Sequence, residues 1–464
     1  MARLGTLLLS GLPLMCAAVT FAADPIVLEA EHAILIGRTH IAHENPDGTG
    51  RAWVTGFVQP GDALDFTINV PAASDYRLEF TYSADGDKHI PVTVGDNLLG
   101  SRRLPKTDGF ETRPYGRVPL VAGDNRLRIG TDWGHADIDA IRLSPAAPAP
   151  FFDLATGPVN PNASPEARAL FTRLTREFGR RTFAGQHEAD VRNPTRLDQV
   201  AHLAGGAAPA ILGLDLQLYS QVWTNPEPTG ATELALDWAR RGGIVTLSWH
   251  WLSPFGARGE PVWDTFYTNR TTFDASRIAD QTSPEHAAIM LDLDRIAVQL
   301  ARLRDARVPV LWRPLHEAEG GWFWWGARGP ETAKTLYRLM FERFTSHHRL
   351  DNLIWVWTTT DNDDATAWYP GYEYVDVLAA DLYAPAGSRG DFSAVFDRIR
   401  ELHQGRKPIA LGECGALPLL TDRAPWLWLL VWDDHIVRHE VNAPADVARL
   451  YRSPRVVTLP PDSP

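Results

Sequence analysis

Cysteine is almost missing from this sequence, which contains two in 464 residues, Cys16 and Cys414. Residues 1–23 carry one basic residue, Arg3, then a short apolar stretch and small residues. This is the pattern of a cleaved secretory signal peptide. A chain without that segment keeps one cysteine, so an internal disulfide is excluded and core packing must supply the stability.

Long apolar runs and basic runs are also missing. After residue 23 no stretch is apolar enough to span a bilayer, and Met15 before Cys16 fits a lipoprotein cleavage site poorly. We therefore expect a secreted protein, extracellular or periplasmic, with no membrane partner. The net charge of −12 argues against a nucleic-acid partner. No glycine-rich phosphate loop follows a strand, and no G-x-S-x-G motif occurs. We expect a monomer.

Tryptophan, in contrast, is abundant, with seventeen residues. The densest aromatic group ends the stretch 308–326, VPVLWRPLHEAEGGWFWWG. Its apolar start suits a buried parallel strand, and polar residues including Glu317 follow. Successive side chains point in different directions, so the four aromatics 322–325 cannot all face one core. Some must line a surface or a cleft, and a carboxylate beside tryptophans indicates a site that cleaves sugars.

Residues 25–145 have a period-two pattern, such as Tyr76, Leu78, Phe80 and Tyr82 alternating with polar residues. Short strands with turns between them and no helical period predict an all-β sandwich. Its first strand, expected over 26–31, places Glu29 and Glu31 on one face about 6–7 Å apart. Their repulsion is relieved either by full solvation or by a shared Ca²⁺, to which Asp137 and Asp139 of the last strand add oxygen ligands.

A Pro/Ala linker, 146–150, separates this module from a second domain expected over 151–460. There, helical segments alternate with eight short apolar runs, which predicts a (β/α)8 TIM barrel. Active residues of such barrels lie at the carboxyl ends of the strands. The runs are 182–186, 209–214, 243–248, 308–312, 352–357, 375–380, 408–411 and 427–431.

Polar and aromatic residues follow the runs on that one side, including Glu317 after the fourth run and Glu413 after the seventh. Glycoside cleavage needs such a pair, one carboxyl as the acid and one as the nucleophile or base. Arg313, four residues before Glu317, would keep a neighbouring carboxylate ionised. The residues alone leave open which carboxyl has which role. His187, His250 and His316 are an alternative metal set, but HEAEG lacks the H-E-x-x-H spacing.

Two resemblances sharpen these expectations, the first in the N-terminal module. IVLEAEHA, GDALDFTINVPAASDYRLEFTYS and NRLRIGTDWGHADIDAIRL resemble a family 35 carbohydrate-binding module. The resemblance implies a jelly-roll sandwich with a structural calcium held by Glu29, Glu31 and Asp139. It also implies a sugar site in the loops, with Trp133 as its contacting aromatic; core packing is the alternative for Trp133.

WRPLHEAEGGWFWWG and ALGECG closely resemble glycoside hydrolase family 26, a retaining family made up mostly of β-1,4-mannanases. The resemblance implies that Glu317 is the acid/base and Glu413 the nucleophile. Asp433 stands where many relatives carry a basic residue that contacts the sugar. The supporting and substrate-contacting residues that the resemblance implies are His250, Arg313, His316, Trp322, Asp381, Tyr383, Trp432 as the floor under the sugar, and Trp263.

The expected function is therefore a secreted retaining hydrolase of β-1,4-mannosidic bonds in mannan, glucomannan or galactomannan, a mannan endo-1,4-β-mannosidase without a catalytic cofactor. Alternatives in the same class are an exo-acting enzyme that releases mannobiose, or a relative acting on mixed-linkage β-glucan or β-1,3-xylan. A different class is a catalytically silent sugar-binding protein, against which the presence of Glu317, Glu413 and Arg313 argues.

Overall fold

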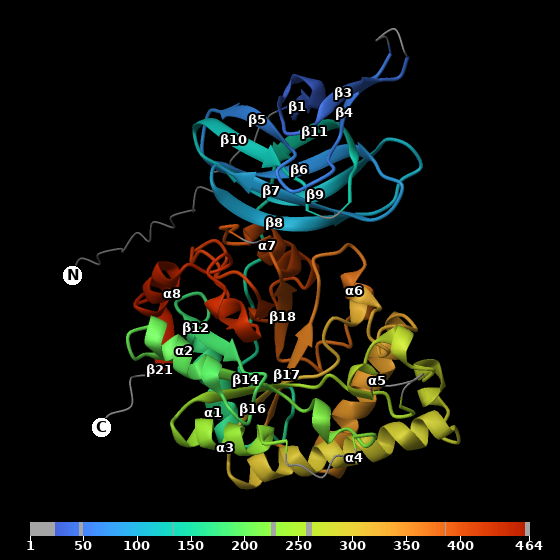
Figure 1. The fold of residues 1–464 in the computed structure, drawn as a ribbon, viewed down its shortest axis with the longest axis vertical. Helices are drawn as coiled ribbons and strands as arrows, with labels where there is room; N and C mark the ends of the chain where they lie inside the picture. The colour runs from blue at the N-terminus through green and yellow to red at the C-terminus, as the bar shows by residue number, and fades with distance from the viewer. Residues whose placement is uncertain are drawn as a thin grey trace, which may run out of the picture.

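The structure is a computed structural model that describes residues 24–45, 50–132, 134–223, 229–256, 262–385 and 387–459. The predicted signal peptide, 1–23, and Trp133 lie outside the described residues. Figure 1 shows an all-β module above a larger domain in which strands and helices alternate. In the described part of the chain no helix is long and apolar enough to cross a membrane.

The module consists of two antiparallel sheets that face each other. One has the order β3-β4-β11-β6-β9, with β1 also paired to β11, and the other β2-β5-β10-β7-β8. The alternating residues Tyr76, Leu78, Phe80 and Tyr82 of β6 are buried in the core between them. The all-β prediction is confirmed. The strands are β1 (Ile26–Glu29), β2 (Ile34–Ile36), β3 (His40–His43), β4 (Ala52–Thr55), β5 (Ala63–Val70), β6 (Ser74–Ser83), β7 (Lys88–Val94), β8 (Asn97–Leu104), β9 (Glu111–Leu120), β10 (Gly123–Ile129) and β11 (Asp137–Pro145).

The first strand is shorter than the sequence pattern predicted. β1 ends at Glu29, and Ala30–His32 form a 3-10 turn, η1, so Glu31 does not share a strand face with Glu29. The turn forms because Ala33 N–H donates to Ala30 O instead of continuing the ladder with β11. Ala30 is fully buried at this turn, which anchors it to the module core.

In the second domain, eight described parallel strands form a closed barrel, because β12 pairs with both β14 and β20. Each overlaps one of the eight predicted apolar runs, so the TIM-barrel prediction is confirmed. Two further strands, β13 (Ala208–Pro209) and β21 (Val456–Leu459), pair with each other beside β12. The barrel strands are β12 (Thr182–His187), β14 (Ile211–Asp215), β15 (Ile244–Ser248), β16 (Val310–Arg313), β17 (Leu353–Thr358), β18 (Val377–Leu382), β19 (Ile409–Cys414) and β20 (Trp428–Val431).

Helices surround the barrel, and several begin at a capping residue followed by proline. Ser164 and Ser283 accept hydrogen bonds from the third residue of α1 and α4, respectively, and proline occupies the first helical position of both. The helices are α1 (Pro165–Glu177), α2 (Thr195–Leu203), α3 (Ala231–Arg240), α4 (Pro284–Asp305), α5 (Pro330–Glu342), α6 (Ala365–Trp368), α7 (Ser393–Leu402) and α8 (Pro444–Tyr451). Short helical turns are η2 (Gln217–Tyr219), η3 (Val262–Asp264), η4 (Thr268–Arg270), η5 (Ala275–Ala279), η6 (Ala318–Gly320), η7 (Arg343–His347) and η8 (Asp433–Val437).

Most of the tryptophan excess fills the core rather than a sugar site. Ten of the seventeen tryptophans belong to the largest fully buried side chains. Trp312, Trp355 and Trp357 lie on adjacent strands β16 and β17. All three pack in the barrel core cluster, the large group of buried apolar side chains of the second domain. Only tryptophans that stay accessible are therefore available to a ligand, and in the described residues Trp322 and Trp263 are each at least half exposed.

Candidate active site

Glu317 is placed in the barrel mouth by an unusual backbone. After β16 ends at Arg313, both Leu315 (φ 52°) and Glu317 (φ 54°) adopt the left-handed conformation. This conformation is costly for residues with a side chain, and it persists where the surrounding structure holds it. Leu315 is buried, and Trp325 Nε1 donates a 2.9 Å hydrogen bond to His316 O. The turn therefore directs Glu317 into the mouth of the barrel.

Arg313 connects the second carboxylate to its neighbours. Its guanidinium, which is 2% exposed, donates to Glu413 and to Asp381 Oδ2 at 2.9 Å. Tyr383 OH donates to the other oxygen of Glu413, Oε2, at 2.6 Å. Arg313 thus holds the Glu413 side chain from one side and Tyr383 from the other, a setting that stabilises an ionised carboxylate.

Gly412 makes room for this arrangement. A Cβ atom at Gly412 would lie 2.6 Å from Asp381 Oδ1 and 3.4 Å from Arg313 Cδ. Because real Cβ atoms essentially never come within 3.0 Å of another heavy atom, the contact with Asp381 Oδ1 leaves room only for glycine at this point of β19. The glycine directly before Glu413 is therefore required by the packing of Arg313 and Asp381.

Glu317 has a different electrostatic environment from Glu413. Burial raises its pKa to about 7, and the negative charge of Glu413 acts in the same direction. Trp322 Nε1 donates a 2.9 Å hydrogen bond to Glu317 Oε2, which favours the ionised form and limits the rise. A carboxyl that keeps its proton near neutral pH can act as a general acid.

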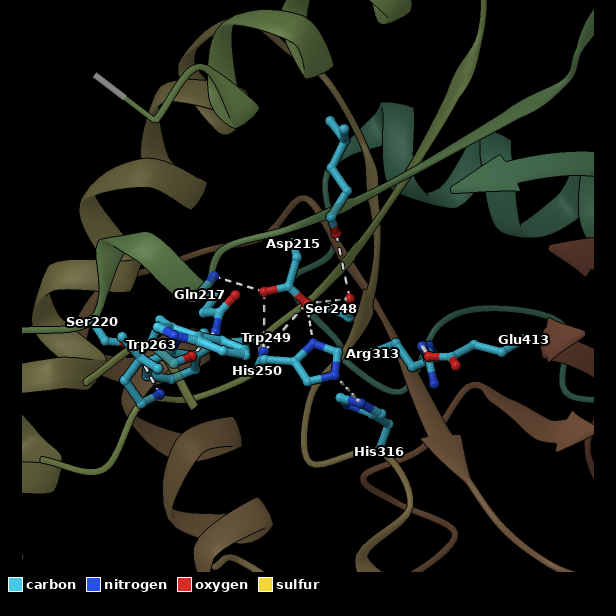
Figure 2. Close-up of polar contacts among 12 residues, drawn as sticks. Asp215, Gln217, Ser220, Ser248, Trp249, His250, Trp263, Arg313, His316 and Glu413 are labelled. Carbon is cyan, nitrogen blue, oxygen red and sulfur yellow. Dashed lines mark hydrogen bonds and ion pairs between the residues drawn. The ribbon is translucent and has the colours of Figure 1, made fainter. Parts of the chain in front are cut away.

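A chain of three side chains leads from β14 to the residue before Glu317 (Figure 2). Asp215 Oδ2 lies 2.7 Å from His250 Nδ1, and His250 Nε2 lies 3.2 Å from His316 Nε2. Burial works to lower the pKa of His250, but Asp215 outweighs it and the pKa is raised. Burial lowers the pKa of His316 well below its usual value. His250 Nδ1–H therefore donates to Asp215, and a single proton lies between His250 Nε2 and His316 Nε2.

The aromatic run 322–325 divides between surface and core. Trp322 is 50% exposed, whereas Phe323, Trp324 and Trp325 are buried. The ring of Trp322 lies against Gly320, where a Cβ atom would come within 2.1 Å of the ring. The glycine break in the sequence thus has a packing reason, because any side chain at Gly320 would displace the accessible tryptophan.

Trp432 follows β20 and stacks on His187, with ring centroids 3.8 Å apart and planes inclined by 17°. It lies 5.8 Å from His250, so its ring borders the same mouth. Asp433 Oδ1 accepts a 3.3 Å hydrogen bond from Arg196 Nε of α2, so a basic side chain lies beside this position. The nine catalytic-domain residues apart from Trp263 that the sequence singled out thus gather around one mouth: His250, Arg313, His316, Glu317, Trp322, Asp381, Tyr383, Glu413 and Trp432.

Trp263 lies further out. It is 54% exposed on η3, and its carbonyl accepts a 2.5 Å hydrogen bond from Gln217 Nε2 (Figure 2). Gln217 in turn donates its backbone N–H to Asp215 Oδ1 at 2.6 Å. Trp263 is therefore joined to the Asp215 group through Gln217, at the rim and not in contact with either glutamate among the interactions of the described residues.

One set of acidic residues has the spacing of a metal site. Ligand oxygens of Glu317, Asp381 and Glu413 lie within 4.8 Å of one another. Arg313, however, donates to both Asp381 and Glu413 and already supplies the positive charge there. A cation at this position would have to displace the guanidinium, so these three residues do not fit a metal.

In the described residues, the predicted calcium ligands of the module do not gather closely enough to hold a metal ion as they stand, although their charges suit a cation. Burial raises the pKa of Glu29 and of Asp139, and Glu31 raises both further, so the three charges lie near one another. Glu31 Oε2 is buried without a hydrogen-bond partner among the described residues. Arg51 lies 3.8 Å from Asp139 and partly balances the charge. A hard cation would give the orphaned carboxylate oxygen its missing partner.

Sequence reasoning left two residues of this site without a role. Asp215 directly follows the second apolar run and ends β14, and its contact with His250 could be expected only from the fold. Glu319 was not singled out; burial raises its pKa to about 7, and its carboxylate accepts a 3.1 Å hydrogen bond from Thr360 N–H. The only sequence signal for Glu319 was its place two residues after Glu317.

Comparisons with known proteins agree with this geometry. Residues 159–461 match the model of glycosyl hydrolase family 26, and residues 26–146 match the carbohydrate binding module of family 35. A mannan endo-1,4-β-mannosidase of Thermothelomyces thermophilus is 40% identical over 443 residues, 93% of this chain and 89% of that protein. Mannan endo-1,4-β-mannosidase A of Piromyces sp. is 30% identical, covering 88% of this chain and 67% of that one.

Solved structures show the same relationship. A GH26-CBM35 β-(1,4)-mannanase of Podospora anserina has a TM-score of 0.64 and 38% identity, covering 94% of this chain and 98% of that one. A β-mannanase from a symbiotic protist of the termite Reticulitermes speratus, complexed with gluco-manno-oligosaccharide, has a TM-score of 0.61 and 33% identity, covering 66% and 98%. With its barrel, its glutamate pair and these matches, the chain belongs to glycosyl hydrolase family 26 and carries a family 35 carbohydrate binding module.

Proposed function

We propose that this protein is a secreted endo-acting β-1,4-mannanase that cleaves with retention of configuration. One observation carries the proposal: Glu317 and Glu413 lie together at the barrel mouth in opposite electrostatic settings, one protonated near neutral pH and one held by Arg313 and Tyr383. Their oxygens lie within 4.8 Å. Retaining glycosidases have carboxyl groups about 5–5.5 Å apart, and inverting ones about 6.5–9.5 Å.

The first step of the reaction forms a covalent glycosyl-enzyme. A carboxylate oxygen of Glu413 attacks the anomeric carbon while the bond from that carbon to the glycosidic oxygen breaks. Glu317 donates its proton to the departing oxygen. Glu317 still holds this proton near neutral pH because burial raises its pKa to about 7.

The second step releases the sugar. Glu317, now ionised, takes a proton from a water molecule, whose oxygen attacks the anomeric carbon and displaces Glu413. Arg313 and Tyr383 then again stabilise the free carboxylate of Glu413. Glu317 ends protonated, so the cycle closes without a cofactor.

Mannan is the proposed substrate because a relative that matches 93% of this chain is named a mannan endo-1,4-β-mannosidase, and a solved structure with both domains is named a GH26-CBM35 β-(1,4)-mannanase. Glucomannan and galactomannan contain the same bond. The accessible ring of Trp322, hydrogen-bonded to Glu317, offers a stacking surface at the point of cleavage. Exo action with release of mannobiose, and action on mixed-linkage β-glucan or β-1,3-xylan, are the competing outcomes of the test.

The module completes the proposal. A structural Ca²⁺ at Glu29, Glu31 and Asp139 would neutralise three carboxylates; the pKa values of Glu29 and Asp139 are raised first by burial and further by the charge of Glu31. Trp133 is proposed to contact the module's own sugar ligand. The signal-like residues 1–23 support export, and we propose that the protein acts outside the cytoplasm as a monomer.

The test of substrate and mode is digestion of mannan, glucomannan, lichenan and β-1,3-xylan, with the products sized over time. We expect a spread of manno-oligosaccharides from the mannans. If mannobiose were the sole early product, the proposed endo mode of cleavage would be wrong and the enzyme would be exo-acting. Cleavage of lichenan or β-1,3-xylan in preference to mannan would overturn the substrate assignment.

The test of roles uses Glu317→Ala and Glu413→Ala. Both should lose at least about 1,000-fold in kcat on mannan. Glu317→Ala should still form the glycosyl-enzyme from an aryl mannobioside, because a good leaving group needs no proton. Glu413→Ala should not. The opposite pattern would exchange the two roles, and near-wild-type activity of either variant would refute its role.

A further inference from the structure

The module and the barrel domain meet in a packed junction. Strand β8 lies against α7, where Leu98 N–H donates to Arg389 O at 2.9 Å and Phe392 N–H donates to Leu98 O at 3.3 Å. The Leu98 side chain packs in the barrel core cluster, and Ala394 of α7 packs in the module cluster. Figure 1 shows the module above α7. The two hydrophobic cores therefore interlock.

Buried ion pairs hold the same junction. Arg117 of the module, 5% exposed, donates to Glu401 of α7 at 2.5 Å. Arg423 bridges the two domains, with 2.7 Å to Asp75 of the module and 3.0 Å to Asp397 of α7. Because the side chains of Arg117 and Asp397 are 5% and 6% exposed, losing a partner would leave each of them as a buried unpaired charge, which is costly. The module is thus held in one position relative to the active site.

A cavity of about 270 Å³ opens beside this junction, and both domains line it. The barrel domain contributes Glu317, Trp322 and Tyr383, and the module contributes Ser101 and Asp132. Glu413 and Trp432 do not line it. The cavity therefore reaches the active site from the side of the acid, with the module as one of its walls.

The side of the acid is the side of the leaving group. Glu317 protonates the oxygen between two sugar units, and the unit that keeps this oxygen departs. A space that includes Glu317 but not the nucleophile is where the departing sugar units must lie. The barrel wall of this space is polar at Glu319 and Thr360, and Trp322 adds an aromatic face, a mixture that suits a sugar.

We propose that the module forms a wall of the leaving-group part of the cleft, where Ser101 and Asp132 bind hydroxyl groups of the departing mannan segment. Asp132 Oδ2 accepts a 2.7 Å hydrogen bond from Ser101 Oγ, which orients the carboxylate. A carboxylate can accept from two adjacent sugar hydroxyls. Asp132 also precedes Trp133 in the sequence. This inference rests on the proposed function and gives the module a part in the choice of the bond that is cut.

The experiment follows which bond of mannopentaose is cut. Hydrolysis in H₂¹⁸O labels the new reducing end, so mass spectrometry separates products of equal length that come from different bonds. The variants are Ser101→Ala and Asp132→Asn. The second substitution keeps the shape of the side chain and removes its charge. The matched control is Asp124→Asn, because Asp124 lies on the module, bonds to Asn69 and does not line the cavity. Thermal unfolding checks that all variants are folded.

We expect both variants to shift cleavage toward the reducing end, because weaker contacts hold fewer sugar units on the leaving-group side. We also expect kcat/KM on mannopentaose to fall about 3- to 10-fold in each, as loss of one hydrogen bond predicts. If both variants cut each bond of mannopentaose as often as the wild type and kept full activity, the proposed role of the module in the cleft would be refuted. The proposed function would stay intact. A wild-type protein that cuts no manno-oligosaccharide would overturn the proposed function itself.

Discussion

Trp322 Nε1 donates a 2.9 Å hydrogen bond to Oε2 of Glu317, so the half-exposed tryptophan at the mouth of the barrel is bonded to the acid itself. The bond acts against burial and the charge of Glu413, which raise the pKa of Glu317. One side chain thus offers a surface to the sugar and adjusts the proton affinity of the acid. The two effects can be separated, because only the second depends on pH.

The pH profile gives the first prediction. Glu317 must hold a proton for the first step, so kcat/KM should fall as the pH rises through about 7. In Trp322→Phe the hydrogen bond that favours the ionised form is lost, and this alkaline limb should move to higher pH. The measurement is kcat/KM on a soluble mannan from pH 5 to 9.

Trp263→Phe serves as the control, since Trp263 is exposed but not bonded to Glu317. It should leave the limb in place even if KM rises. An unchanged limb in Trp322→Phe, with only KM affected, would mean that the hydrogen bond has no influence on the acid.

Gly320→Ala should act through the same tryptophan. The added Cβ would lie within 2.1 Å of the Trp322 ring, so the ring must move away from Glu317. We expect kcat/KM to fall about 10-fold or more and the alkaline limb to shift as in Trp322→Phe. Gly321→Ala changes a glycine whose Cβ would meet nothing within 4 Å, although its φ of 70° disfavours alanine. It separates local backbone strain from displacement of the ring, and an equal effect of both substitutions would refute the displacement.

Tyr383→Phe removes the hydrogen bond to Glu413 Oε2 and leaves the Arg313 contact intact. A hydrogen bond to a charged group contributes about 1.5–3 kcal/mol, so we expect kcat to fall about 10- to 100-fold. Stopped-flow kinetics with an aryl mannobioside should assign the loss to release of the sugar from the glycosyl-enzyme, the step in which Glu413 leaves as a free carboxylate. Wild-type kcat would show that Arg313 alone is sufficient to support the nucleophile.

Asp215→Asn should destabilise the protein in a pH-dependent way. The pKa of His250 is raised by Asp215, so its contribution to stability is present below its usual 6.5 and is lost as the pH rises through the higher folded pKa. The pKa of Asp215 is lowered, chiefly by His250 against the opposing effect of burial, so its contribution is present above 3.8 and is lost on acidification. The Asp215–His250 pair therefore stabilises the folded protein most between pH 3.8 and pH 6.5.

The measurement is the unfolding temperature from pH 4.5 to 9. We expect the gap between wild type and Asp215→Asn to be widest near pH 5–6 and to narrow above the folded pKa of His250. Asp294→Asn is a control at a surface cluster, where Asp294, 38% exposed, lies 2.7 Å from His348 and accepts hydrogen bonds from Arg343 at 2.8 and 2.9 Å; its effect should be small. If the difference in unfolding temperature between wild type and Asp215→Asn were the same at every pH, the link between this ion pair and the pH dependence of stability would be refuted.

Much of the fold was predictable because backbone geometry imposes a period on the sequence. The eight apolar runs all correspond to barrel strands, and Glu317 and Glu413 follow two of them as predicted. Glu31 was placed wrongly on a strand because the choice between another ladder residue and the η1 turn depends on where Ala30 is buried. That burial is set by the module core, which comes from distant segments.

The sequence by itself determined the strand–helix alternation, the module, the family motifs and the two glutamates, because each depends on residues close together in the chain. Only the tertiary structure decided that Asp215, His250 and His316 form a hydrogen-bonded chain, that Gly412 fits between Asp381 and Arg313, and that the module walls the cavity beside Glu317. These features depend on distances and burial between segments far apart in the chain, and the desolvation that gives Glu317 its proton exists only when those segments close around it.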